Sequence, residues 1–391
     1  MRNKVMLLLT LGLMLILLAA CGGAAQPEVA PATDETTDAP AAGEETEATP
    51  AEEAPVEEEA PVEEEAPAEE EAPAEEEAPA EGEAATGDAT YILVPKALGN
   101  PYFDTANQGA QEAAEELGVG VTYQGPATAD ATAQIQLLNS LIAQQVSGLA
   151  VSANDADALV PVGQTAISEG IPVVSWDSAI AEGGRTVHVN QADAEGIGRG
   201  LIQLTSELIG GEGQIAILSA TSTAPNQNEW IEWMEQELEN PEYDNIELVA
   251  TVYGDDEDEK SYNEALGLMQ TYPELDAIIS PTTVGIAAAA RAVQDQDRIG
   301  EVTVTGLGTP NQMREYVMSG ASPAFMLWNP ADLGYLAIQT LHAINSGQIE
   351  GNPGDTFTAG RLGEYTIDEN GVVLLGPPTV FNADNIDDFD F

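Results

Sequence analysis

The chain has 391 residues and a formal net charge of −58 at neutral pH, from 68 acidic and only 10 basic side chains. So negative a field repels the phosphate backbone, and the composition therefore excludes nucleic acid as a partner. The single cysteine, Cys21, excludes an internal disulfide and a multi-cysteine metal site.

The first 21 residues have the features of an export signal. Arg2 and Lys4 precede an apolar run over 6–20, too short to span a membrane comfortably, and small residues come before Cys21. The Leu18-Ala19-Ala20-Cys21 ending resembles a bacterial lipoprotein signal, in which the cysteine is lipidated and becomes the new N-terminus. We predict a signal peptide over 1–20, lipidation of Cys21, and anchoring to the extracytoplasmic face of the cell membrane. The alternative is an ordinary signal peptide with an incidental cysteine.

Residues 21–88 form a segment of mainly Ala, Pro, Glu and Thr without an aromatic residue. Three glutamates, an alanine and a proline recur every six residues over 57–80. These prolines prevent a continuous helix, and the glutamates repel one another. Because the segment cannot bury enough apolar surface to offset its conformational entropy, we predict a disordered tether. A solvated spacer is favoured over an acidic partner-binding tail.

The acidic excess extends beyond this tether. Residues 22–88 hold 24 of the 68 acidic side chains, which leaves 44 acidic and 8 basic side chains in residues 89–391, a formal charge near −36. Salt would screen the repulsion among these negative charges, and acid would protonate some of the carboxylates. We interpret this surface as an adaptation to a saline or acidic habitat.

From residue 89 onwards, short apolar strands alternate with helices of period near 3.6. In the first half the pattern predicts strands over 91–95, 120–123, 148–152 and 171–176, and helices over 102–117, 131–145 and 157–169. In the second half it predicts helices over 193–208, 228–239, 260–272 and 286–295, and strands over 214–219, 247–253, 277–280 and 302–306. Alternating elements of this kind require parallel sheets, and the length exceeds what one core usually supports. We predict an α/β fold of two Rossmann-like lobes with parallel sheets.

Polar and aromatic side chains follow the carboxyl ends of the predicted strands, where parallel α/β sheets bind ligands. Carboxylates, amides and hydroxyls can hydrogen-bond paired hydroxyls, and aromatic rings can cover the C–H face of a sugar-like ring. We therefore predict a site for a small polyhydroxylated ligand. Its candidate residues are Lys96, Asn100, Tyr102, Phe103, Asn154, Asp155, Asp177, Asn226, Gln227, Pro281, Thr282, Thr283, Trp328 and Asn329.

Two pairs of these candidates have an equally good structural interpretation. Asn154 and Asp155 precede a predicted helix and could simply cap it, and Thr282 and Thr283 could cap the helix that follows them. At both positions the sequence leaves the two interpretations open.

For three other residues the sequence favours either a functional or a structural interpretation. Asp177 directly follows an apolar strand, where an unpaired carboxylate is costly to bury, and this favours a functional role. Lys96 is one of two lysines in residues 89–391, and we expect it to pair with Asp177 or with a ligand oxygen. Trp230 is interpreted as a core residue.

At these residues the chain resembles the type I periplasmic binding proteins that feed sugars to ABC importers, within the branch of rhamnose-binding and autoinducer-2-binding proteins. The likeness extends over 89–391. It rests on Val94–Lys96, Asn100–Asp104, Ser152–Asp155, Ser175–Ser178, Asn226–Trp230, Pro281–Gly285, Val304–Gly308 and Trp328–Pro330.

The resemblance implies a monomer of two lobes joined by three hinge strands, which closes on its ligand and docks on the permease subunits of an importer. By the family pattern, the N-lobe is 89–190 plus 330–350 and the C-lobe is 191–327 plus 360–391.

The implied ligand depends on residues at which the two kinds of binder differ. Six positions match ligand contacts of the family: Lys96, Asp177, Asn226, Gln227, Pro281 and Thr283. Autoinducer-2 binders carry an aspartate where this chain has Asn226 and an Asp-Ala pair in place of Thr282-Thr283, whereas rhamnose-type binders match at both places. The tail over 370–391 resembles the autoinducer-2 side. Because pocket residues outweigh tail residues for ligand choice, we favour rhamnose or a related deoxy sugar or pentose, with autoinducer-2 as the alternative.

The sequence contains no catalytic or cofactor motif. His188 and His342 lie far from any nucleophile signature, and no Gly-x-x-x-x-Gly-Lys-[Ser/Thr] phosphate loop occurs. The acidic run 255–259 lacks the alternation and glycine of a calcium loop, and we interpret it as a solvated turn. We predict no enzyme activity, no cofactor and no metal. A ligand sensor for a membrane receptor and a secreted sugar-modifying enzyme are the alternative classes.

Overall fold

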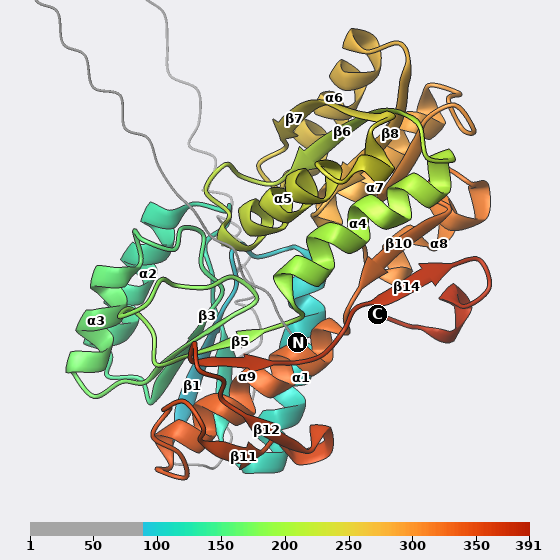
Figure 1. The fold of residues 1–391 in the computed structure, drawn as a ribbon. Helices are drawn as coiled ribbons and strands as arrows, with labels where there is room; N and C mark the ends of the chain where they lie inside the picture. Colours follow the sequence, from blue (N-terminus) through green and yellow to red (C-terminus); the bar gives the residue numbers. More distant parts are fainter. Residues whose placement is uncertain (1–88) are drawn as a thin grey trace, which may run out of the picture. The chain divides into compact units, whose positions relative to one another are not determined.

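The computed structural model describes residues 89–391 (Figure 1). The predicted signal peptide 1–20, the predicted lipidation site Cys21 and the predicted tether 21–88 lie outside the described residues. Among the helices of 89–391, none has both the length and the apolar character that a membrane span requires.

One lobe, the N-lobe, is built on a six-stranded sheet of order β13-β5-β4-β3-β1-β2, in which all neighbours are parallel. Strand side chains alternate between its faces: Tyr91 and Leu93 pack in one hydrophobic cluster with α1, and Ile92 and Val94 pack in another with α2 and α3. The strands are β1 (Thr90–Val94), β2 (Gly120–Tyr123), β3 (Gly148–Val151), β4 (Val173–Trp176), β5 (Val187–Asn190) and β13 (Val372–Leu374). The helices are α1 (Pro101–Leu117), α2 (Ala131–Ala143), α3 (Val160–Ser168) and α9 (Pro330–Asn345).

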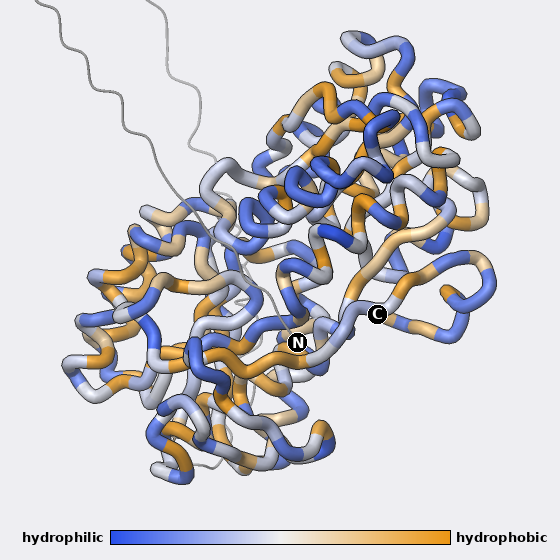
Figure 2. Tube along the Cα trace, in the orientation of Figure 1, coloured by the Kyte–Doolittle hydropathy of each residue, from blue (hydrophilic) through white to orange (hydrophobic). Residues whose placement is uncertain are grey.

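The other lobe, the C-lobe, contains a four-stranded parallel sheet of order β7-β6-β8-β9. Its strands are β6 (Gly213–Ser219), β7 (Ile246–Tyr253), β8 (Leu275–Ser280) and β9 (Thr303–Gly306), and β10 (Ala324–Leu327) pairs antiparallel with β14 (Thr379–Asn382). The helices are α4 (Ala194–Ile209), α5 (Pro225–Leu238), α6 (Asp258–Thr271), α7 (Thr283–Asp295) and α8 (Pro310–Ser319). Figure 2 shows hydrophobic segments along the strands of both lobes and hydrophilic segments in many of the loops.

Short elements complete the described chain. β11 (Thr356–Thr358) and β12 (Glu364–Thr366) form an antiparallel pair, and single 3-10 turns occupy Pro241–Tyr243, Gly360–Leu362 and Ile386–Asp388. The predicted α/β fold of two lobes with parallel sheets is therefore confirmed.

The described chain passes between the lobes three times: from β5 to α4, from β10 to α9, and from β13 to β14 (Figure 1). The last passage corrects the predicted assignment of 360–391 to the C-lobe. β13 instead pairs with β5 at the edge of the N-lobe sheet, where Val373 is fully buried. Only with β14 does the chain return to the C-lobe, because β10 supplies an edge there for an antiparallel partner.

Helices α1 and α9 lie unusually close together in the N-lobe. A Cβ atom at Gly109 would lie 1.7 Å from the carbonyl oxygen of Ala331, and one at Gly334 would lie 1.9 Å from that of Ala106. Because glycine has no side chain, the two backbones can touch. Both helices begin with an asparagine whose side chain caps the first turn, Asn100 for α1 and Asn329 for α9.

Candidate functional site

A cavity lies between the two lobes, at the carboxyl ends of their strands. About 360 Å³ of space is free of protein atoms there, part of it open to solvent. The lining residues come from both lobes and are Lys96, Asn100, Tyr102, Phe103, Asp177, Asn226, Gln227, Trp230, Asp256, Pro281, Thr282, Thr283, Leu307, Leu327 and Trp328.

Asp177 is a buried carboxylate of the cavity that two hydroxyl donors hold in place. It follows β4 directly and is 4% exposed. Its Oδ1 accepts a hydrogen bond from the Tyr102 hydroxyl at 3.0 Å, and its Oδ2 accepts one from the Ser152 hydroxyl at 2.7 Å. Two donors fix the orientation of this buried carboxylate, and each charge-assisted hydrogen bond is stronger than a neutral one.

Lys96 provides the cation of the cavity. Its Nζ donates to Asn226 Oδ1 at 2.8 Å and lies 4.0 Å from Asp177 Oδ2, in agreement with the expected pairing. Burial lowers the pKa of Lys96, while the negative charges of Asp177 and Asp256 act in the opposite direction. The buried ammonium thus depends on these two carboxylates.

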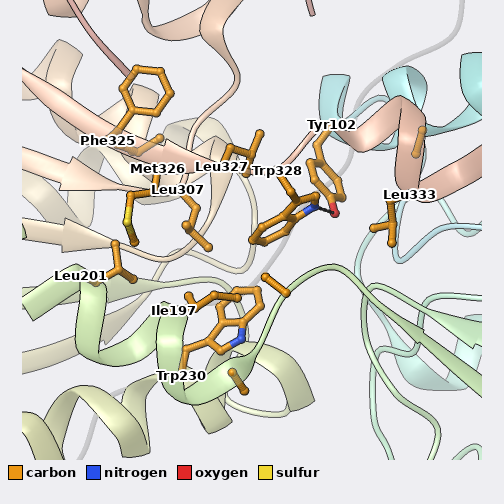
Figure 3. Close-up of a cluster of buried hydrophobic side chains, with 14 of the residues drawn as sticks. Tyr102, Ile197, Leu201, Trp230, Leu307, Phe325, Met326, Leu327, Trp328 and Leu333 are labelled. Carbon is orange, nitrogen blue, oxygen red and sulfur yellow. Dashed lines mark hydrogen bonds between the residues drawn. The ribbon is translucent and has the colours of Figure 1, made fainter. Parts of the chain in front are cut away.

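Aromatic side chains from both lobes line the cavity. Figure 3 shows three of them, Tyr102, Trp328 and Trp230, within a cluster of buried side chains. The Trp328 indole Nε1 donates to the Tyr102 hydroxyl at 2.9 Å, and the two rings meet edge to face. Trp230 lies against Trp328 with ring centroids 5.9 Å apart. A chain of donors therefore runs from Trp328 through Tyr102 to Asp177, and burial followed by the charge of Asp177 raises the pKa of Tyr102 well above its usual value. Trp230 belongs to the core, as predicted, and also lines the cavity.

The C-lobe presents amides and hydroxyls at the starts of two helices. Gln227 Oε1 accepts from the Ser219 hydroxyl at 2.8 Å and from the Ala220 N–H at 2.9 Å. The end of β6 thereby holds the first turn of α5 in place. Thr282 stands at the N-cap position of α7 but makes no capping hydrogen bond, and its hydroxyl instead donates to the carboxylate of Asp256. The capping interpretation therefore does not hold for the Thr282 side chain.

Asp256 is a cavity carboxylate that the sequence did not single out. It lies between β7 and α6, within the acidic run interpreted as a solvated turn, and the structure corrects that interpretation for this one residue. Its Oδ2 accepts from Asn100 Nδ2 of the other lobe at 3.1 Å. Burial raises the pKa of Asp256, and the hydrogen bond from Thr282 and the charge of Lys96 partly oppose that rise.

Both cavity carboxylates have a left-handed backbone conformation, with φ of 59° at Asp177 and 58° at Asp256. Residues other than glycine adopt this conformation at a cost, although aspartate and asparagine tolerate it better than most. Strained residues of this kind concentrate at binding sites.

Eleven of the fourteen predicted residues line the cavity, and Asn154, Asp155 and Asn329 do not. Asp155 accepts from the N–H groups of Asp157 and Ala158 and so stabilises a local turn. Asn329 accepts from the N–H of Ala331 and so caps α9. Asn154 Nδ2 donates to the Lys96 carbonyl at 2.9 Å and thereby supports the loop that carries the lysine.

Besides Asp256, the sequence did not identify Leu307 and Leu327 as lining residues. Each follows or ends a short apolar strand, so nothing in its own residue type marks it as part of a site. In residues 89–391 no group of three or more His, Cys, Asp or Glu side chains is arranged to hold a metal ion.

Comparisons with known proteins agree with this geometry. The family described as a periplasmic binding protein domain matches residues 91–349. The chain is similar to a sugar ABC transporter protein from Actinomyces odontolyticus, with 46% identity over 79% of this chain and all of that one, and a TM-score of 0.64. It is 37% identical to an ABC transporter solute-binding protein from Clostridium phytofermentans with bound L-rhamnose, over 77% and 97% of the two chains (TM-score 0.74). It is 26% identical to LsrB from Clostridium saccharobutylicum in complex with AI-2, over 78% and 100% (TM-score 0.74).

Proposed function

We propose, since this chain belongs to the periplasmic binding protein family, that it captures a neutral sugar between its lobes and delivers it to the permease of an ABC importer. Rhamnose, or a related deoxy sugar or pentose, is the favoured ligand. The observation that carries this proposal is the cavity itself, which has polar and aromatic side chains from both lobes.

The chemistry of the lining suits a ring that carries several hydroxyl groups. Asp177 retains free lone pairs after its two hydrogen bonds, and Lys96 Nζ can donate to a further oxygen. Trp328 and Trp230 offer apolar surface for the C–H face or the methyl group of a deoxy sugar. The bound L-rhamnose of the Clostridium phytofermentans relative supports this choice of ligand class.

Lobe closure follows from the division of the lining between the lobes. Lys96 donates to Asn226 across the cleft, and Thr223 of the C-lobe donates to the Asn154 carbonyl of the N-lobe at 3.2 Å. A ligand that contacts both lobes binds the closed arrangement better than an open one and shifts the population towards it.

A thermal-shift screen tests the proposal. The chain without its predicted signal peptide is mixed with L-rhamnose, other deoxyhexoses, pentoses and autoinducer-2. A ligand that binds only the folded state raises the melting temperature, by an amount equivalent to about 2.7 kcal/mol at a hundred times its Kd. We expect a shift with rhamnose or a close relative. No shift with any neutral sugar would refute the sugar-uptake proposal.

Autoinducer-2 is the second candidate ligand. Lys96, Asp177 and Gln227 all line the cavity, and these are the positions at which the sequence resembles autoinducer-2 binders. The AI-2 complex of the Clostridium saccharobutylicum relative supports this alternative. A shift with autoinducer-2 alone would assign the protein to signal import and would show that Asn226 and Thr282 do not select the ligand.

The membrane anchor is also part of this proposal, with lipid at Cys21 holding the protein near its importer. Replacement of Cys21 by serine should release the protein from the membrane fraction into the surrounding fluid. The unchanged chain should remain with the membrane and incorporate labelled fatty acid. Membrane association that survives Cys21→Ser would exclude the lipid as the anchor.

A further inference from the structure

Asp256 differs from its acidic neighbours in where its carboxylate lies. Asp255 is exposed and pairs with Lys260, and Asp258 is exposed and pairs with Arg291. The carboxylate of Asp256 instead lies inside the cleft, where one oxygen accepts from Thr282 and the other from Asn100. One residue of a charged turn has thus been brought into the cavity.

The local backbone accounts for this placement. Asp255 and Asp256 are consecutive left-handed residues, with φ of 54° and 58°. The chain therefore turns sharply after β7, and the Asp255 N–H donates to the Ala220 carbonyl at 2.9 Å, which ties the turn to the loop after β6. Aspartate tolerates this conformation better than most residues other than glycine, which permits two such residues in succession at this turn.

The charges that line the cavity are unequal. Among its lining residues, Lys96 is the one cation, and Asp177 and Asp256 are both carboxylates. The lysine is 4.0 Å from Asp177 and donates to Asn226 rather than to Asp256. The positive charge of Lys96 is therefore already balanced by two carboxylates, and an anionic ligand would meet a net negative site.

We propose that Asp256 is a ligand-recognition residue of the C-lobe, which accepts a hydrogen bond from a ligand hydroxyl and, together with Asp177, restricts the site to neutral sugars. Sugar acids and phosphorylated sugars are rejected by the second carboxylate. This inference rests on the proposed function of the cavity and adds to it the class of ligand that the site excludes.

The lone pairs of Asp256 permit this role. Each carboxylate oxygen receives one hydrogen bond, from Thr282 or Asn100, and can accept another. A ligand that donates one hydroxyl to Asp256 and another to Asp177 would connect the C-lobe with the N-lobe, because the two residues belong to different lobes. An anionic group about 4 Å from Asp256 would instead lose about a thousandfold in affinity, from Coulomb repulsion at an effective dielectric constant of about 20.

The experiment compares matched ligands and matched variants by calorimetric titration of the chain without its predicted signal peptide. L-rhamnose, L-mannose and L-mannuronate differ only at C6. L-rhamnose carries a methyl group there, L-mannose a neutral hydroxymethyl group and L-mannuronate a carboxylate. Asp256→Asn removes the charge and keeps a side chain that tolerates a left-handed backbone. Asp256→Gly, which also accepts this backbone, provides a second variant. Asp255→Asn is the control, because Asp255 has the same charge and backbone conformation but faces solvent.

We expect wild-type protein and Asp255→Asn to bind L-rhamnose and to discriminate strongly against L-mannuronate. Asp256→Asn should weaken L-rhamnose binding by about tenfold and reduce the discrimination between L-mannose and L-mannuronate by tenfold or more. In the contrary outcome, wild type and Asp256→Asn bind a neutral sugar equally well and both exclude L-mannuronate. That result would overturn the role of Asp256 and leave the proposed function standing. Wild-type protein that binds no neutral sugar would overturn this inference together with the proposed function.

Discussion

Replacing Asp177 by asparagine should remove most of the ligand affinity while the fold persists. The carboxylate accepts from Tyr102 and Ser152 and lies 4.0 Å from the Lys96 ammonium. Asparagine is preferable to alanine because the backbone φ of 59° suits it better. A hydrogen bond to a charged group is worth about 1.5–3 kcal/mol, so the loss of one ligand contact should weaken binding about ten- to more than a hundredfold.

The amide also disturbs what holds the site together. One of its two polar atoms is a donor, so the variant cannot accept from both Tyr102 and Ser152 as the carboxylate does. Lys96 would keep Asp256 as its remaining carboxylate neighbour in the cavity. Both effects add to the loss of ligand contact.

Calorimetric titration with L-rhamnose, or with whichever neutral sugar the screen identifies, measures the effect. Asp155→Asn is the matched control, because Asp155 was a candidate on sequence grounds but lies outside the cavity and accepts from the N–H groups of a turn, which an asparagine oxygen can also do. Its affinity should stay within about twofold of wild type. An Asp177→Asn protein that melts like wild type and binds the sugar within threefold of it would refute the reasoning.

Three further predictions concern stability. Burial, and then the nearby charge of Arg185, lower the pKa of His188 to about 3, so below the usual value near 6.5 the unfolded chain binds a proton that the folded chain does not. The free energy of unfolding should therefore fall as the pH is lowered from 6.5 to 3. Urea titrations at several pH values measure this slope, and His188→Asn should reduce it by up to about 1.4 kcal/mol per pH unit. Equal slopes in the two proteins would contradict the assignment. Gly109→Ala should cost about 1–3 kcal/mol by parting α1 from α9, whereas Gly267→Ala, whose Cβ would meet nothing within 4 Å, should stabilise α6 by about 0.5–1 kcal/mol. Because residues 89–391 carry a charge near −36, raising sodium chloride to about 1 M should raise the melting temperature, and a salt-independent melt would remove the habitat interpretation.

The fold was predictable because most elements have a strong periodicity of their own. Helix α1 shows the reason: Phe103, Ala106, Ala110 and Ala113 recur at helical spacing and are all buried. The strands of the N-lobe that were predicted are nearly continuous apolar runs, as strands covered on both faces should be.

Two strands that the sequence missed, β5 and β13, depend on distant partners. β5 has four residues, Val187–Asn190, and its alternation with a histidine and an asparagine is too short to stand out. β13 has three residues and exists because β5 offers it an edge, which no local pattern reveals. For the same reason the tail 360–391 was assigned to one lobe although it contributes to both.

The site was predictable as far as the rule of strand ends applies. Lys96, Asp177 and Gln227 come directly after strands or at helix starts, so their place in the chain indicates the cavity. Asp256 lies in a run of acidic residues that would look alike on any surface. Its position depends on two left-handed residues and on Asn100 of the other lobe, and both are consequences of the tertiary structure.

The two carboxylates explain why closure and recognition should be coupled. Asp177 is held by donors of its own lobe, Tyr102 and Ser152, and keeps its orientation whether or not the lobes meet. Asp256 is held by Thr282 of its own lobe and by Asn100 of the other, so opening the cleft removes one of its two donors. A partly buried carboxylate that loses a donor regains one from water or from a ligand. A ligand hydroxyl that donates to Asp256 therefore contributes most when the lobes are closed around it, which is the differential affinity that drives a population shift.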